Sequence, residues 1–186
     1  MLPEISLNIL DIAENSVRAK ATLIAITVAV DPDADTLTVI IADDGCGMDA
    51  ETLTRVQDPF YTTRKTRKIG LGIPFFKQEA EGTDGSFAIE SEEGKGTTVT
   101  AVFGLSHIDR MPLGDISSTV YTLVVFNEQI DFLYTYRYKE NSFTLDTREF
   151  REILGDDVSF ADAEVSAFIR SYLEENKAET DGGAQI

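Results

Sequence analysis

Four basic side chains fall within five positions of a chain that is otherwise acidic, directly before a glycine-rich turn. They lie in the stretch DPFYTTRKTRKIGLGI, residues 58–73, and are Arg64, Lys65, Arg67 and Lys68. Cations followed by glycines and a helix start suit a polyphosphate, because backbone N–H groups and the positive end of a helix dipole meet there. A solvated basic turn has the same composition, so this stretch alone leaves phosphate binding and a surface turn as alternatives.

Two other segments carry side chains suited to a nucleotide. Asp11 and Asn15 lie one helical turn apart and offer an acid and an amide to a water and a cation. Asp43 ends an apolar run and is followed by Gly45 and Gly47, which allow the backbone to approach a ligand closely. A carboxylate at this position can accept a hydrogen bond from an exocyclic amine such as that of adenine. The alternatives are the wet face of an amphipathic helix for the first pair and a tight strand-to-helix turn for the second.

The composition limits the classes of function. The chain has 186 residues, a net charge of −17 and 42% hydrophobic residues, which is typical of one globular domain, alone or with an appendage. The acidic excess argues against nucleic-acid and anionic-membrane partners. The single cysteine, Cys46, excludes an internal disulfide. With neither a signal peptide nor an apolar run of ~20 residues, we expect a cytoplasmic protein.

Hydrophobic periodicity predicts the elements that position these residues. In the first part of the chain they are a helix at 4–19, strands at 22–30 and 36–42, helices at 49–56 and 71–81, and strands at 85–91 and 97–103. This order predicts an α/β two-layer sandwich with helices on one face of a sheet. After a linker at 105–114 the pattern predicts a helix at 115–127, strands at 130–138 and 142–146, and helices at 147–154 and 161–176.

These elements suggest three parts: a domain at 1–104, a C-terminal α-β-β-α extension at 105–176 and a disordered tail at 177–186. Because there is no room for an edge strand before the first helix, the strand pair of the extension is a candidate to extend the main sheet. A partner-docking lobe is the alternative.

The motifs occur in a fixed order: Asp11 with Asn15, Asp43-x-Gly45-x-Gly47, Gly70-x-Gly72, and Gly94-x-Gly96-Thr97. Over residues 4–104 this pattern resembles the GHKL superfamily of ATP-binding domains, which includes gyrase-type topoisomerases, heat-shock chaperone ATPases, histidine kinases and mismatch-repair ATPases. The resemblance implies a Bergerat-type mixed sheet and implies ATP and Mg²⁺ as cofactors.

The resemblance implies a role for each matching residue. Asn15 matches the asparagine that ligates Mg²⁺, and Asp43 matches the carboxylate that binds the adenine amino group. The residues beneath and beside the adenine match Gly45, Gly47 and Thr97. The second glycine box, where backbone donors meet the phosphates, matches Gly70, Leu71 and Gly72. The stretch at residues 58–73 resembles the lid segment that covers the nucleotide in this superfamily. The resemblance implies one aromatic lid residue and three candidate phosphate-binding cations in it: Phe60, Lys65, Arg67 and Lys68.

Two features point to different subfamilies. The segment LDIAENSVRAKAT is similar to that of mismatch-repair ATPases, in which a glutamate four residues before the asparagine is the general base. Here Asp11 takes that position and is the candidate base, but its side chain is one methylene shorter, so we expect inefficient hydrolysis. The short lid, in contrast, resembles that of histidine kinases.

The only histidine, His107, lies in SHIDRMP, which is similar to the acceptor box of histidine kinases. The acid that follows the histidine in that box is replaced by Ile108, and the segment comes after the ATP-binding domain. His107 is therefore a candidate phosphoacceptor, with a linker or packing histidine as the alternative.

Three functions follow. The first is a regulatory kinase or weak ATPase that binds Mg-ATP and acts on an unidentified protein partner or phosphoacceptor. The second is a nucleotide-gated binding protein without turnover, similar to the kinase-type anti-sigma factors. A hydrolysing conformational ATPase ranks third because of the short lid and Asp11. The sequence leaves the oligomeric state open.

Overall fold

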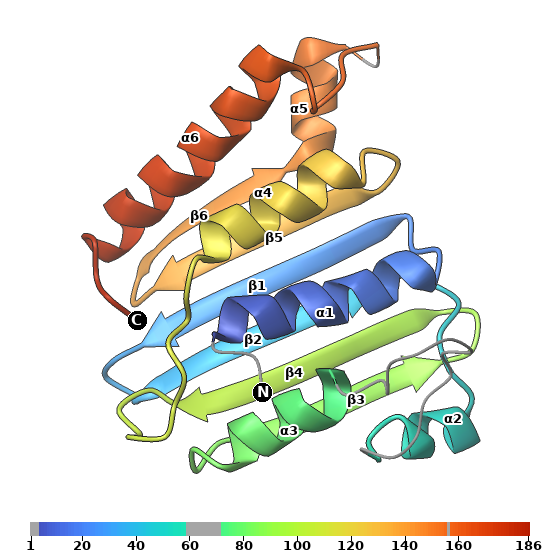
Figure 1. Cartoon of the computed structure of the whole chain (residues 1–186), viewed down its shortest axis with the longest axis vertical. Helices are drawn as coiled ribbons and strands as arrows, with labels where there is room; N and C mark the ends of the chain where they lie inside the picture. Colours follow the sequence, from blue (N-terminus) through green and yellow to red (C-terminus); the bar gives the residue numbers. More distant parts are fainter. Residues whose placement is uncertain (1–3, 59–71, 156) are drawn as a thin grey trace.

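The computed structural model describes residues 4–58, 72–155 and 157–186. Within these ranges the chain forms one six-stranded sheet with the strand order β3-β4-β2-β1-β5-β6 (Figure 1). The strands are β1 (Leu23–Asp31), β2 (Thr36–Asp43), β3 (Ser86–Glu92), β4 (Gly96–Gly104), β5 (Asp131–Tyr138) and β6 (Asn141–Asp146). The helices are α1 (Ile5–Arg18), α2 (Ala50–Arg55), α3 (Gly72–Glu81), α4 (Ile116–Phe126), α5 (Thr147–Leu154) and α6 (Ala163–Asp181). The predicted α/β two-layer sandwich is confirmed.

Alternating side chains build the centre of this sheet. In β1 every second residue is buried, from Ile24 to Val30, and β2 pairs with it in antiparallel register with the same alternation. Figure 1 shows α1, α3 and α4 lying across one face. The helix α1 buries Ile5, Ile9 and Ile12 against this face, as its helical spacing predicts. The core therefore lies between the sheet and its helices, with α1 above the central strands.

The C-terminal strand pair belongs to the same sheet. β5 runs parallel to β1, with Leu23 opposite Asp131, and β6 pairs with β5 in antiparallel register. Phe132, Tyr134 and Tyr136 of β5 are buried in the same core as α1 and β1. Residues 131–146 therefore lie in the main sheet, where β5 covers the edge that β1 would otherwise present unpaired.

The predicted disorder of residues 177–186 is wrong. The helix α6 continues to Asp181 and ends at Gly182 in the left-handed conformation. The Asp181 carboxylate accepts hydrogen bonds from the Tyr136 hydroxyl at 2.9 Å and the Lys177 ammonium at 2.6 Å, and its side chain is buried. The Ile186 carbonyl oxygen accepts a bond from the Leu113 N–H at 2.9 Å. A polar composition suggested a tail, but a buried tyrosine hydroxyl needs the partner that this segment supplies.

No helix among the described residues combines the length and the apolar character needed to cross a membrane.

Candidate functional site

A cavity of about 470 Å³ lies at the end of the sheet where β2 stops and β4 begins. Many of the residues singled out in the sequence line it, although they come from elements far apart in the chain: Asp11, Asn15, Asp43, Gly47, Gly72 and Thr97. Asp11 and Asn15 come from α1, Asp43 from the end of β2, and Thr97 from the start of β4. The fold therefore brings the motif of Asp11 with Asn15, the motif that starts at Asp43 and the motif that ends at Thr97 around one cavity, together with the start of α3.

The Asp43 carboxylate is held by two donors. Ser16 Oγ donates to Oδ2 at 2.5 Å, and the backbone N–H of Gly45 donates to Oδ1 at 2.9 Å. Thr97 is directly opposite Asp43 in the β2–β4 ladder. A carboxylate can accept several hydrogen bonds, and two of those of Asp43 are made within the chain. These two bonds fix the orientation of the carboxylate and with it the direction of its remaining lone pairs. This arrangement suits recognition of an amino group.

Ser16 was not among the predicted site residues. Its position at helical spacing with Ile9, Ile12 and Ala13 placed it on the apolar face of α1, and it is buried. A hydroxyl on a buried helix face needs an acceptor, and that need is the signal in the sequence that could have linked it to an acid elsewhere in the chain.

The neighbouring Asp44 has a different task. Its carboxylate accepts bonds from the Thr22 N–H at 2.7 Å, the Thr22 hydroxyl at 2.5 Å and the Leu23 N–H at 2.9 Å. Desolvation acts to raise the pKa of Asp44, but the bonds from Thr22 and Leu23 outweigh it and hold this pKa below its ordinary value. Asp44 therefore fixes the start of β1, while Asp43 faces the cavity.

Two glycines let backbone segments touch beside Asp43. Gly47 has φ of 64°, and a Cβ at this position would lie 1.9 Å from the Glu92 carbonyl oxygen. Gly96 has φ of 110°, and its Cβ would lie 1.9 Å from the carbonyl oxygen of Asp43. Only glycine fits both the conformation and the space. The loop after β2 is therefore pressed onto the β3–β4 turn and closes one side of the cavity.

Thr97 is also held in place on this side. Its hydroxyl lies 2.8 Å from Ser91 Oγ, which accepts a bond from the Met48 N–H at 2.9 Å. The Ser91 hydroxyl thus joins the loop after β2 to the start of β4.

At the other side of the cavity, α1 meets the start of α3. A Cβ on Gly72 would lie 2.0 Å from Asp11 Oδ2, so the carboxylate is packed against the first residue of α3. Asn15 Oδ1 accepts a hydrogen bond from the Arg18 guanidinium, which also pairs with Glu14 at 3.5 Å. An acid, an amide and a helix N-terminus therefore meet where a polyphosphate and its cation would fit.

Asn8 lies on the same stripe of α1 as Asp11 and Asn15, but it is not solvated. It is 1% exposed and donates from Nδ2 to Glu79 Oε2 of α3 at 2.6 Å. Burial raises the pKa of Glu79 to about 7, although the bond from Asn8 acts to lower it. This hydrogen bond joins α1 to α3, about one turn of α1 before Asp11.

Six predicted site residues lie outside the described residues: Phe60, Lys65, Arg67, Lys68, Gly70 and Leu71. Their roles stay predictions.

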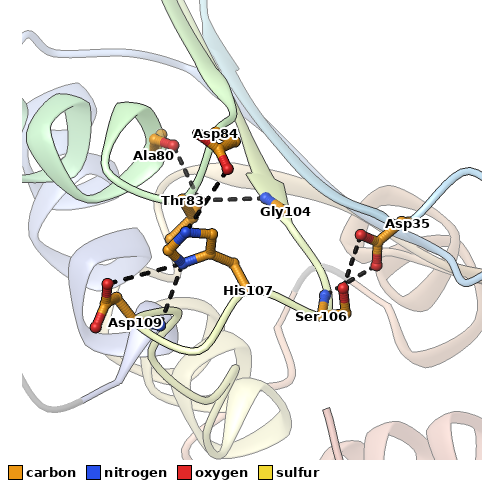
Figure 2. A network of polar contacts seen from close by, with 8 residues as sticks. All are labelled: Asp35, Ala80, Thr83, Asp84, Gly104, Ser106, His107 and Asp109. Atoms are coloured by element: carbon orange, nitrogen blue, oxygen red, sulfur yellow. Dashed lines mark hydrogen bonds and ion pairs between the residues drawn. The ribbon is translucent and has the colours of Figure 1, made fainter.

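His107 lies at the opposite end of the sheet. Thr36 pairs with Gly104 at that end, and Thr36 and Asp43 are seven residue steps apart along β2. At ~3.3 Å per residue the two ends are about 23 Å apart. Figure 2 shows the ring held by its neighbours: Nδ1 accepts a bond from the Asp109 N–H at 3.2 Å, and Nε2 lies 3.7 Å from Asp84 Oδ2. The structure does not bring His107 to the cavity, and its role as a phosphoacceptor stays a prediction.

Comparison with known proteins assigns the family. Residues 3–107, more than half of the chain, match the family model described as histidine kinase-, DNA gyrase B- and HSP90-like ATPase. The chain therefore belongs to this family of ATPases, the GHKL superfamily, and membership of the family implies ATP binding.

The relatives are mainly sensor kinases. A sensor protein of Shewanella frigidimarina is 33% identical over 110 residues, which are 58% of this chain and 16% of that protein. Sporulation kinase C of Bacillus subtilis is 32% identical over 96 residues, which are 52% of this chain and 22% of that kinase. The chain thus spans less than a quarter of the length of either relative. The chain is a histidine kinase-like ATPase module.

A solved N-terminal domain of a DNA repair protein shares the fold. It superposes with a TM-score of 0.56 over 78% of this chain and 52% of that one, at 12% identity.

Proposed function

We propose that this protein binds Mg-ATP in the cavity and acts on a partner protein as a cytoplasmic regulatory kinase or weak ATPase. One observation carries the proposal: the Asp43 carboxylate is oriented by Ser16 and Gly45 opposite Thr97, while Asp11 and Asn15 meet the start of α3 across the same cavity. Adenine would lie at Asp43 and the phosphates at α3.

The residues present fit a magnesium ion that arrives with its nucleotide. Among the described residues no group of three histidine, cysteine, aspartate or glutamate side chains could hold a metal ion. Mg²⁺ keeps several waters and is commonly held by one or two protein oxygens and by phosphates. Asn15 would supply its amide oxygen, and Arg18 would have to release that oxygen first. When bound, the ion supplies charge neutralisation at the phosphates.

Asp11 decides between turnover and binding alone. As the candidate general base it would have to reach a water beside the terminal phosphate. Its carboxylate is packed against Gly72, and its side chain is one methylene shorter than that of a glutamate. This contact favours slow turnover, and it also supports the second candidate function, a nucleotide-gated binding protein that holds its partner without hydrolysis.

The test has two parts. Titration calorimetry with ATP, in the presence and absence of Mg²⁺, should give binding that Asp43→Asn weakens and that Asn15→Ala makes independent of Mg²⁺. Equal affinity of the parent and Asp43→Asn would overturn the adenine assignment.

Incubation with γ-labelled ATP then separates the functions. Labelled partner protein indicates a kinase, free phosphate indicates an ATPase, and label recovered only as bound nucleotide indicates a gated binder. Because His107 lies far from the cavity, label on the chain itself should persist in His107→Ala.

A further inference from the structure

A group of apolar side chains is exposed where α5 and α6 meet. The group consists of Ile153 and Leu154 of α5 and Phe168 of α6, with the half-buried Phe150 of α5 beside Phe168; we name these four residues the α5–α6 patch. Ile153 is 81% exposed, Phe168 56% and Leu154 38%. Singly exposed apolar residues are ordinary on a protein surface, but a cluster of large ones commonly marks an interaction site.

The patch rests on a rigid base. The Phe150 ring lies 5.9 Å from Phe168 and 5.6 Å from Tyr172, and Tyr172 packs at 6.3 Å on Phe143 of β6. The Tyr172 hydroxyl also donates to the Thr144 carbonyl oxygen at 2.9 Å. The two phenylalanine rings of the patch are therefore held in place before a ligand binds, which lowers the entropic cost of binding.

The charges around the patch are one-sided. The nearby arginines are occupied within the chain: Arg148 pairs with Asp146 at 2.7 Å, Arg151 lies 3.7 Å from Asp131, and Arg170 stacks 4.0 Å from the Tyr121 ring centroid.

The nearby glutamates are not occupied in this way. Glu149 and Ile153 are one turn apart on α5, as are Glu164 and Phe168 on α6, and Glu152 lies beside Ile153. These three exposed glutamates form no ion pair with any residue that the structure describes. The patch thus presents apolar anchors inside an acidic rim.

We propose that the α5–α6 patch docks an amphipathic helix of a partner protein whose apolar face is flanked by lysine or arginine. Such a helix fills the apolar centre and neutralises the three glutamates. A second copy of this chain on the same patch would bring like charges together, and an anionic membrane would be repelled for the same reason.

The position of the patch suits a regulatory partner. β6 ends at Asp146, which pairs with Leu133 near the start of β5. Because β5 is parallel to β1, this is the end of the sheet where β1 starts at Leu23 and β2 ends at Asp43 (Figure 1). Three strand spacings of ~4.8 Å separate β6 from β2, so the strand end from which α5 continues is about 14 Å to the side of the nucleotide cavity. The proposal goes beyond nucleotide binding and does not depend on it.

The experiment uses a fluorescent helical peptide of about 18 residues, five turns, with leucines on one face and lysines on the other. Fluorescence anisotropy with the whole chain should show binding that weakens as NaCl rises from roughly 50 to 300 mM. Phe168→Ser and Ile153→Ser should each weaken binding at least about tenfold. The variant Glu149→Gln/Glu164→Gln should flatten the salt dependence. A leucine–glutamate peptide should not bind.

The matched control is Ile108→Ser, which removes an even more exposed apolar side chain (93% exposed) at the far end of the sheet. It should leave peptide affinity within about twofold. Equal weakening by Ile108→Ser and Phe168→Ser would overturn the proposal, because it would show that exposed apolar side chains contribute alike wherever they lie on the chain. A dimer that Phe168→Ser dissociates, or binding to anionic vesicles that it abolishes, would also overturn it. ATP titration of each variant shows whether the fold and the nucleotide site remain intact.

Discussion

Asp43 and Thr97 are cross-strand partners at the end of the β2–β4 ladder, and both line the cavity. Each is already bound to a serine: Asp43 Oδ2 lies 2.5 Å from Ser16 Oγ, and Thr97 Oγ1 lies 2.8 Å from Ser91 Oγ. These two side chains of the cavity are therefore held in place within the chain, which would lower the cost of binding the proposed nucleotide.

The adjacent acids Asp43 and Asp44 should separate nucleotide affinity from stability. Asp43→Asn should weaken ATP binding by about 10- to 100-fold, since a charged acceptor of the ligand is lost. Asp44→Asn should leave ATP affinity within about threefold but lower the free energy of unfolding by about 1 kcal/mol, because the bonds from Thr22 and Leu23 lose their charged acceptor. Calorimetry and urea unfolding measure the two effects. An equal loss of affinity in both variants would contradict the division of roles.

The contact between Asp11 and Gly72 predicts a steric effect that a second substitution relieves. Alanine is a better helix former than glycine, so Gly72→Ala can destabilise α3 only through its Cβ, which would lie 2.0 Å from Asp11 Oδ2. We expect a loss of about 1–3 kcal/mol in the free energy of unfolding and about tenfold in ATP affinity.

Adding Asp11→Ala to Gly72→Ala should bring the free energy of unfolding back to within about 1 kcal/mol of Asp11→Ala alone. Additive losses in the double variant would show that Asp11 is not the group that Gly72 accommodates. Urea unfolding of the four proteins completes the cycle.

Glu79 predicts a pH dependence of stability. Burial raises its pKa to about 7 in the folded protein, against an ordinary value of 4.5. The folded state then binds more protons between these values, so the stability that this carboxyl contributes is present below pH ~4.5 and is lost as the pH rises through ~7.

Glu79→Gln keeps the acceptor for Asn8 and removes the charge. Relative to the parent, it should gain about 1 kcal/mol between pH 5 and pH 8, a figure already discounted because the group is half-exposed. Thermal unfolding of both proteins at the two pH values checks this. A difference in Tm that does not change with pH would contradict the assignment.

The C-terminal anchor predicts that truncation is costly. Removing residues 177–186 deletes Lys177 and Asp181 and leaves the buried Tyr136 hydroxyl without its acceptor, so we expect a loss of at least about 3 kcal/mol. Tyr136→Phe, which removes both the donor and the need for an acceptor, should cost about 1 kcal/mol. A truncated chain as stable as the parent in urea would show that the tail is dispensable.

The same anchor should respond to acid. Desolvation acts to raise the pKa of Asp181, but the bonds from Lys177 and Tyr136 outweigh it and lower this pKa below 3.8. The stability from this carboxylate is present above the unfolded pKa and is lost as the pH falls through the folded one. Below pH 4, the Tm of the parent should therefore fall more steeply than that of Asp181→Asn. Parallel curves for the two proteins would contradict this.

Local patterns in the sequence were enough to predict each element. The alternation in β1 and β2 and the spacing in α1 predict boundaries within one or two residues of those observed. A strand with one buried face repeats an apolar residue at every second position, and a helix with one buried face repeats it at every third or fourth position. The motifs also pointed to three side chains that line the cavity, Asn15, Asp43 and Thr97, and the roles of these side chains stay predictions.

Only the tertiary structure decided how distant segments meet. It placed β5 beside β1, buried Asn8 against Glu79, turned Ser16 toward Asp43 and moved His107 to the far end of the sheet. The partners in each of these contacts are brought together by the pairing of strands and the packing of helices, and no local pattern records that pairing. The ordered end of α6 has the same cause, because its buried acid is required by a tyrosine 45 residues earlier.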